Sequence, residues 1–168
     1  WERIFSIYKS YGLNHVRFHS WCPPEAAFTA ADRIGIYIQA EVLWIDWWMS
    51  VVRKERPEMT TRGLPKGLGH NPSADKFVPE ELQRMIEAYG NHPSFTMLCI
   101  GNELGNSNFD IMQQWIKSLQ EKDPRRLYAI STARKIMPAD QYMVTHNIPQ
   151  TGGTYGINGS GTDNDRES

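Results

Sequence analysis

The sequence predicts an α/β fold in which helices cover a parallel sheet, either as a barrel or as an open doubly wound sheet. Short apolar segments, which are typical of buried strands, alternate along the chain with segments whose apolar residues recur at helical spacing. This order of strand, helix, strand, helix is the one that parallel strands joined by crossover helices produce.

The first part of the chain contains two predicted pairs of helix and strand. We expect a helix over residues 1–11, which ends before Gly12, and then a buried strand over residues 13–19. A second helix is predicted over residues 24–35. The apolar segment after it is predicted to be a strand over residues 36–41.

A long loop and a third pair follow. Residues 42–78 lose their periodicity and turn rich in Gly, Pro, Lys and Arg, so we expect a functional or disordered loop. Three tryptophans lie near its start: Trp44, Trp47 and Trp48. A helix opening at Pro79 is predicted to run to Gly90, and the almost wholly apolar segment 95–100 is predicted to be the next strand.

The last part of the chain completes the pattern. Asn108 is a candidate cap for a fourth helix, which precedes a strand predicted over residues 127–131. A further strand is possible over residues 142–146. Residues 151–168 show no pattern, so we expect one domain over residues 1–150 and a poorly ordered tail after it.

The composition indicates a globular chain with a neutral partner. The 168 residues carry a formal net charge of -1 and are 40% hydrophobic, which gives no reason to expect nucleic acid or an anionic membrane. No apolar run approaches the roughly 20 residues of a membrane span. Cys22 and Cys99 are predicted to be ordinary buried thiols, and neither a cofactor motif nor a metal-binding pair of histidines is present.

Polar side chains collect where the predicted strands end. In a parallel barrel these ends lie on one face, where the loops after the strands build active sites. They are Arg17, His19, Glu41, Asn102, Glu103, Ser131, Thr132 and His146. Hexose rings have apolar faces and hydroxyl rims, so the nearby Trp44 is a candidate sugar contact. A strand-end Glu after an Asn suits glycoside cleavage, because the acid protonates the leaving oxygen and the amide holds a neighbouring hydroxyl.

Three segments carry a resemblance to a known family. They are Asn14-His15-Val16-Arg17, then Ala31-Asp32-Arg33-Ile34-Gly35-Ile36 leading to Glu41, and Asn91-His92-Pro93-Ser94 leading to Gly101-Asn102-Glu103. Here the chain resembles glycoside hydrolase family 2, the group of β-galactosidases, β-glucuronidases and β-mannosidases. The resemblance covers roughly residues 1–135. It implies a partial (β/α)₈ TIM barrel, roughly strands two to five or six of eight.

The resemblance also implies an activity and residue roles. The parent protein is expected to be a retaining exo-β-glycosidase that needs no cofactor and is located outside the cytoplasm. Glu103 is implied as general acid/base, Asn102 as the partner of a substrate hydroxyl, and Arg17 as a buried organiser of the catalytic carboxylates. His19 and Glu41 are implied as residues that line or support the sugar site.

In the family, the nucleophilic Glu follows the seventh strand. We therefore expect it outside this chain, and we expect the chain alone to be inactive. Simpler interpretations stay open: Glu103 as a helix-capping carboxylate, and Glu41 as nothing more than the ion-pair partner of Arg17. The alternative function is a non-catalytic carbohydrate-binding or scaffolding piece of a barrel. Because an incomplete barrel exposes sheet edges, homo-oligomers are also expected.

Overall fold

The computed structural model describes residues 1–46, 67–132 and 135–144, which form a parallel sheet with helices on one face. In chain order the elements are α1 (Glu2–Ser10), β1 (His15–Arg17), α2 (Glu25–Ile34), β2 (Tyr37–Glu41), α4 (Pro72–Tyr89), β3 (Phe95–Asn102), α5 (Phe109–Lys122) and β4 (Leu127–Thr132). The four strands lie side by side in the order of the sequence. This order favours a barrel over a doubly wound sheet, in which the strand order reverses.

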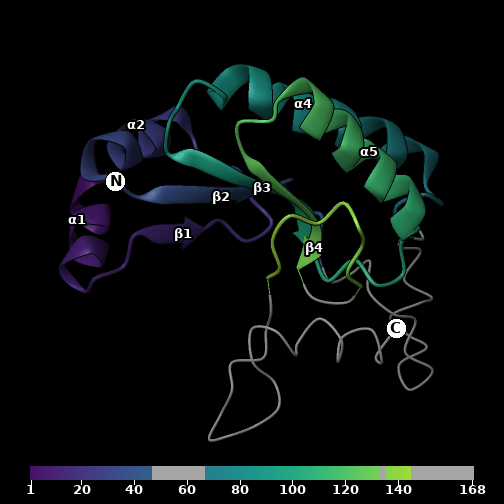
Figure 1. The fold of residues 1–168 in the computed structure, drawn as a ribbon, viewed down its shortest axis with the longest axis horizontal. Helices are drawn as coiled ribbons and strands as arrows, with labels where there is room; N and C mark the ends of the chain where they lie inside the picture. The colour runs from purple at the N-terminus through teal and green to yellow at the C-terminus, as the bar shows by residue number, and fades with distance from the viewer. Residues whose placement is uncertain (47–66, 133–134, 145–168) are drawn as a thin grey trace, which may run out of the picture.

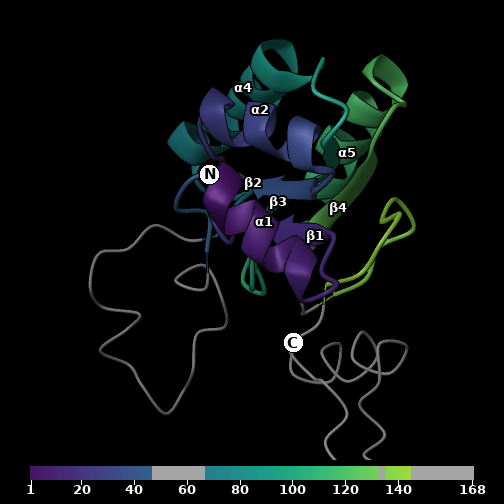
Figure 2. The ribbon, with the colours of Figure 1, turned by 90° about the vertical axis from the view of Figure 1, so that its left-hand side faces the viewer.

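The helices and the sheet form two layers. Figures 1 and 2 show α2, α4 and α5 over one face of the sheet, with α1 beside β1. Ile38 and Ala40 of β2 and Leu98 and Ile100 of β3 belong to the hydrophobic core between the layers. Because side chains alternate along a strand, Glu41 lies on the opposite face of β2 from Ile38 and Ala40.

The predicted elements are confirmed except at three places. Gly35 ends α2 with a left-handed φ of 78°, and the Asn108 side chain caps α5 by accepting hydrogen bonds from the backbone N–H groups of Asp110 and Ile111. The first difference is the strand predicted over residues 13–19, which has only three residues, His15–Arg17, and lies at the edge of the sheet. Leu13 comes before this strand and is 53% exposed instead of buried.

The second difference is the start of α4. The helix begins at Pro72, and Pro79 lies inside it instead of opening it. Asn71 is the N-cap, and the carboxylate of Asp75 accepts hydrogen bonds from the backbone N–H groups of Gly69 and Asn71. Pro79 masked this start in the sequence, because a proline more often begins a helix than continues one. The predicted loop over residues 42–78 is therefore shorter, and residues 47–66 lie outside the described part.

The third difference is the segment after β4. Residues 142–144 are not a strand, and residues 145–146 lie outside the described ranges, as does the predicted tail. Asp140 and Gln141, just before this segment, form hydrogen bonds with the edge of β4 instead. The backbone N–H of Gln141 donates to the carbonyl of Tyr128 (2.9 Å), and the carboxylate of Asp140 accepts from the N–H of Ile130 (2.7 Å). These contacts cover part of an edge that was expected to be open.

A buried ion pair joins the starts of β3 and β4. The Arg126 guanidinium contacts the carboxylate of Asp123, donates to the carbonyls of Gly90 (2.9 Å) and Phe95 (3.1 Å), and lies 4.6 Å from the centroid of the Phe95 ring. The hydroxyl of Tyr128 donates to the carbonyl of Asp123. This cluster lies at the end of the sheet opposite the polar strand ends.

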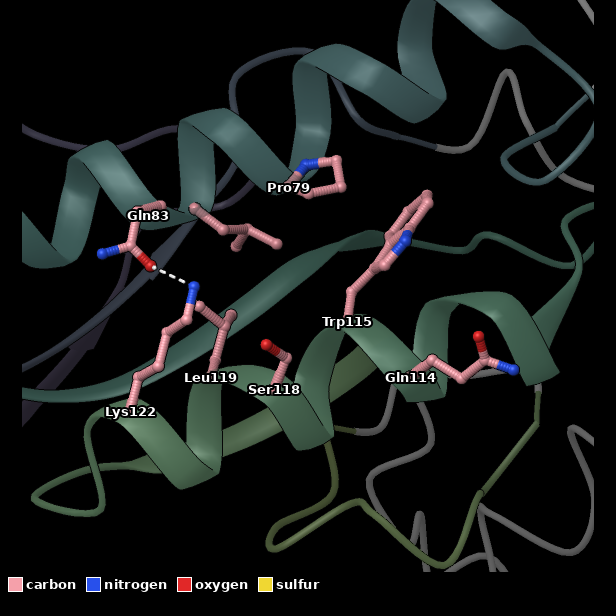
Figure 3. Close-up of a pocket in the computed structure, with 8 residues that line it drawn as sticks. Pro79, Gln83, Gln114, Trp115, Ser118, Leu119 and Lys122 are labelled. Carbon is pink, nitrogen blue, oxygen red and sulfur yellow. Dashed lines mark hydrogen bonds between the residues drawn. The ribbon is translucent and has the colours of Figure 1, made fainter.

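The outer layer contains an apolar groove between α4 and α5. Figure 3 shows Pro79 and Trp115 at one end, and at the other Lys122, whose ammonium donates to the Gln83 side chain at 3.3 Å. No polar residue of the predicted site lines it. None of the helices in the described ranges is both long and apolar enough to cross a membrane.

The contacts of Asp123 predict how the stability of the fold depends on pH. Hydrogen bonds from Arg125, opposed by burial and aided by the charge of Arg126, lower the pKa of Asp123 from 3.8 to about 2. A lowered folded-state pKa stabilises the fold above the unfolded pKa, and this stabilisation is lost as the pH falls towards 2. We expect Asp123→Asn to cost about 2 kcal/mol near neutral pH, with a smaller cost below pH 4.

Urea unfolding of wild type and Asp123→Asn from pH 6 to pH 2 measures this difference. Glu121→Gln, at an exposed position on α5, is the matched control and should follow the wild type. A cost of Asp123→Asn that is the same at pH 6 and pH 2 would contradict the assignment.

Candidate active site

One arginine connects the ends of all four strands. Arg17, Glu41, Asn102 and Thr132 are the last residues of β1, β2, β3 and β4. The Arg17 guanidinium donates to both carboxylate oxygens of Glu41 (2.6 and 3.2 Å), to the amide oxygen of Asn102 (3.0 Å) and to the hydroxyl of Thr132 (2.7 Å). Parallel strands bring these residues together because their carboxyl ends meet on one side of the sheet.

Glu41 is fully buried and has all its acceptor positions engaged. Besides Arg17, its carboxylate accepts hydrogen bonds from the backbone N–H of Ser20 (2.7 Å) and from the side-chain amide of Gln39 (3.1 Å). A buried carboxylate needs such donors, because desolvation without them is costly. The ion pair with Arg17, which was one of the two interpretations of Glu41, is therefore present.

Asn102 is held by charged partners at both ends of its amide. Its oxygen accepts from Arg17, and its nitrogen donates to the carboxylate of Asp46 at 2.7 Å. The other Asp46 oxygen lies 3.9 Å from Nδ1 of His19, whose side chain is half exposed. His19 therefore lies near the network but is not hydrogen-bonded within it at this distance.

Glu103 follows β3 directly and has a strained backbone. Its φ is 53°, and its backbone N–H donates to the carbonyl of Thr132 at 2.9 Å. A left-handed conformation costs a residue other than glycine roughly 1–2 kcal/mol. The turn takes Glu103 out of the line of the strand, and the next N–H, that of Leu104, donates to the hydroxyl of Ser131.

Left-handed backbones collect at this end of the sheet. In the described ranges the non-glycine residues with positive φ are Ser20, Trp44 and Glu103, and each lies in the loop after one of the first three strands. The N–H of Trp44 donates to the carbonyl of Ser20 (3.1 Å), and its side chain is 71% exposed. Such strain is typical of functional sites, because surrounding contacts must hold it in place.

A glycine allows the loop after β2 to lie against β3. A Cβ atom on Gly101 would come within 2.1 Å of the carbonyl oxygen of Ile45, and that same oxygen accepts a hydrogen bond from the N–H of Asn102. The contact carries Asp46, the next residue, to the Asn102 side chain. Gly101 is thus the part of the Gly-Asn-Glu segment that assembles the site.

Several residues in this network were not predicted from the sequence. Gln39 lies two residues before Glu41 and shares its face of the strand, so the period-two rule identifies it once the strand is known. Asp46 lies in a segment without periodicity, and no local pattern marks it. Trp47, Trp48 and His146 lie outside the described residues.

Both cysteines are free in the structure. Burial raises the pKa of Cys22 to about 12 and that of Cys99 well above its usual value. Cys99 is a buried thiol, as predicted, whereas Cys22 is only partly buried. Across the described ranges, no three His, Cys, Asp or Glu side chains are grouped as metal ligands.

Comparison with known proteins identifies the family of the chain. A family model described as "Glycosyl hydrolases family 2, TIM barrel domain" matches residues 2–148. A β-galactosidase of Leuconostoc mesenteroides subsp. mesenteroides is 27% identical over 120 residues, which cover 69% of this chain and 10% of that protein. The chain thus spans only a small part of the length of this relative.

Solved structures show the same fold. A β-glucuronidase of Parabacteroides merdae has a TM-score of 0.57 and 21% identity, and the match covers 77% of this chain and 15% of that one. A glycosyl hydrolase family 2 member of Bacteroides cellulosilyticus has a TM-score of 0.54 and 24% identity, with 82% and 16% covered. The four-stranded sheet is accordingly part of a TIM barrel, as the sequence predicted.

The contacts of Arg17 predict that its removal destabilises the fold. Removal of Arg17 leaves the charge of Glu41 buried without its main partner, so we expect Arg17→Met to destabilise the fold by about 3 kcal/mol or more. The double variant Arg17→Met/Glu41→Leu removes both charges and should regain much of this loss. Arg33→Met, which breaks the exposed pair with Glu2, is the control and should change stability little. Equal effects of Arg17→Met and Arg33→Met in urea unfolding would contradict the prediction.

Proposed function

Because the chain belongs to glycosyl hydrolase family 2, we propose that it forms the part of a retaining β-glycosidase active site that contains the general acid/base, Glu103. The substrate is a glycoside with a terminal β-linked sugar, and the reaction is hydrolysis of that bond. One observation carries the proposal: Glu103 follows β3 directly, with a strained left-handed backbone, next to Asn102 and the Arg17 network.

In the first step, the protonated Glu103 carboxyl group gives its proton to the glycosidic oxygen while that oxygen leaves the anomeric carbon. A second carboxylate bonds to the same carbon from the opposite side. In the second step, the Glu103 carboxylate takes a proton from water, and the water oxygen displaces the second carboxylate from the sugar. Glu103 ends protonated and is ready for another cycle.

The neighbouring residues have supporting roles in this proposal. Asn102 holds a hydroxyl of the bound sugar, and Arg17 fixes Asn102 through the hydrogen bond at 3.0 Å. Glu41 acts through Arg17, because its oxygens are buried and already accept from Arg17, Ser20 and Gln39. The half-exposed His19 and the exposed ring of Trp44 line the mouth of the site, where an apolar ring face suits a sugar.

The nucleophile is proposed to lie outside this chain. In a retaining enzyme the two carboxyl groups are about 5–5.5 Å apart, and the nucleophile must reach the anomeric carbon. Glu41 is enclosed by its donors, and Asp46 is hydrogen-bonded to Asn102. Neither of these two carboxylates of the described ranges is therefore placed to act as the nucleophile, and we expect the 168 residues alone to hydrolyse nothing at a useful rate.

The proposal is tested by extending the chain with its native flanking sequence and measuring hydrolysis of aryl β-galactoside, β-glucuronide, β-mannoside and β-glucoside. We expect activity on one sugar, and Glu103→Gln should lower it by at least about 100-fold, because an amide cannot transfer the proton. Glu121→Gln is the control. Glycan binding without hydrolysis of any sugar would instead support a non-catalytic role.

We also expect association through the open edge of the sheet. β1 is an edge strand, and an unpaired edge is a template for pairing with another chain. Light scattering of the 168-residue chain should show oligomers, whereas the extended chain should show fewer. A single monomeric species of the 168-residue chain at high concentration would contradict this expectation.

A further inference from the structure

Asp46 forms a contact that the proposed reaction does not by itself require. Its side chain is only 15% exposed, and one carboxylate oxygen accepts a hydrogen bond from the Asn102 amide nitrogen at 2.7 Å. Asn102 is 3% exposed, so its amide has little freedom to rotate. A buried carboxylate at this position restricts the orientation of the amide.

The two charged partners of Asn102 fix which end of its amide points where. Arg17 offers only N–H donors, so the amide oxygen must face it, and the Asp46 carboxylate offers only acceptors, so the amide nitrogen must face it. A rotation of the amide by 180° would oppose donor to donor and acceptor to acceptor. Both bonds involve a charged group and are stronger than bonds between neutral groups.

The backbone positions Asp46 for this contact. The carbonyl of Ile45 accepts a hydrogen bond from the N–H of Asn102, and the N–H of Ile45 donates to the carbonyl of Val42 (3.3 Å). The loop is pressed against Gly101, where no side chain fits. Asp46 therefore reaches Asn102 from the loop after β2 and opposes Arg17, which reaches it from the end of β1.

We propose that Asp46 is a positioning residue that holds the Asn102 amide with its nitrogen towards the substrate, so that Asn102 donates a hydrogen bond to the sugar hydroxyl and does not accept one. The amide nitrogen has two hydrogens, and Asp46 takes one. In this proposal the other donates to the substrate, because the amide oxygen is engaged by Arg17. This inference rests on the proposed function, and it specifies how that site recognises its sugar.

The test uses the extended, active protein and two substrates, an aryl glycoside and its 2-deoxy analogue. A hydrogen bond to the 2-hydroxyl that strengthens in the transition state makes the intact glycoside the faster substrate. Asp46→Leu should lower kcat/KM for the intact glycoside by at least about tenfold and leave the 2-deoxy analogue nearly unchanged. A merely structural role would lower both equally.

A double-mutant cycle provides the second measurement. If Asp46 acts through Asn102, Asp46→Leu should cost less than about threefold in an Asn102→Ala background. Asp46→Asn keeps an acceptor oxygen, so it should retain part of the preference for the intact glycoside over its 2-deoxy analogue. It takes the place of Asp46→Leu in these measurements if Asp46→Leu does not fold. Asp110→Leu, at an exposed position on α5, is the control for loss of a carboxylate.

The outcomes separate the two proposals. Activity with a loss confined to the intact glycoside, and no further loss in the Asn102→Ala background, supports the role of Asp46. Equal losses on both substrates, or losses that add to those of Asn102→Ala, overturn that role while the glycosidase assignment stands. No hydrolysis by the wild type on any sugar overturns the glycosidase assignment, and the role of Asp46 with it.

Discussion

The bonding of Arg17 to the ends of four strands is the interaction on which the site depends. One guanidinium has enough donors to reach Glu41, Asn102 and Thr132 at once, and its planar shape fixes their relative positions. Glu41 supplies the charge that keeps Arg17 in place. The loops that follow the strands then begin from a rigid frame, which is what the strained turns at Trp44 and Glu103 need.

The two ends of the sheet have different roles. At one end, Arg126 joins Asp123 to the backbone of Gly90 and Phe95, and Asp32 joins the ring of His92 (2.6 Å) to the N–H of Ser94 (2.9 Å). These contacts tie helices to strand starts. At the other end lie Arg17, Asn102 and Glu103. This division is typical of barrels, where the carboxyl ends of strands carry function and the opposite ends carry stability.

The sequence was sufficient for most of the fold because its signals were local. Apolar strands and helical spacing identified the elements, and the strand ends identified Arg17, Glu41, Asn102 and Glu103, since topology alone brings such ends together. The features that the sequence did not predict depend on contacts between residues that are distant in the chain or on a helix cap that another residue obscured. The start of α4 depends on a side-chain cap at Asn71 that Pro79 obscured. The place of Asp46 depends on the contact between Ile45, in the loop after β2, and Gly101 of β3.

If Glu103 is the general acid/base, its removal leaves a defect that a small anion can repair. In the extended protein, Glu103→Ala should still form the sugar–enzyme intermediate from a substrate with a good leaving group, but it should lack the base that activates water. Azide needs no base. Added azide should therefore restore turnover and yield the β-glycosyl azide, with the configuration of the substrate retained. Failure of azide to restore turnover, or formation of the α-glycosyl azide, would contradict the assignment of Glu103 as the acid/base.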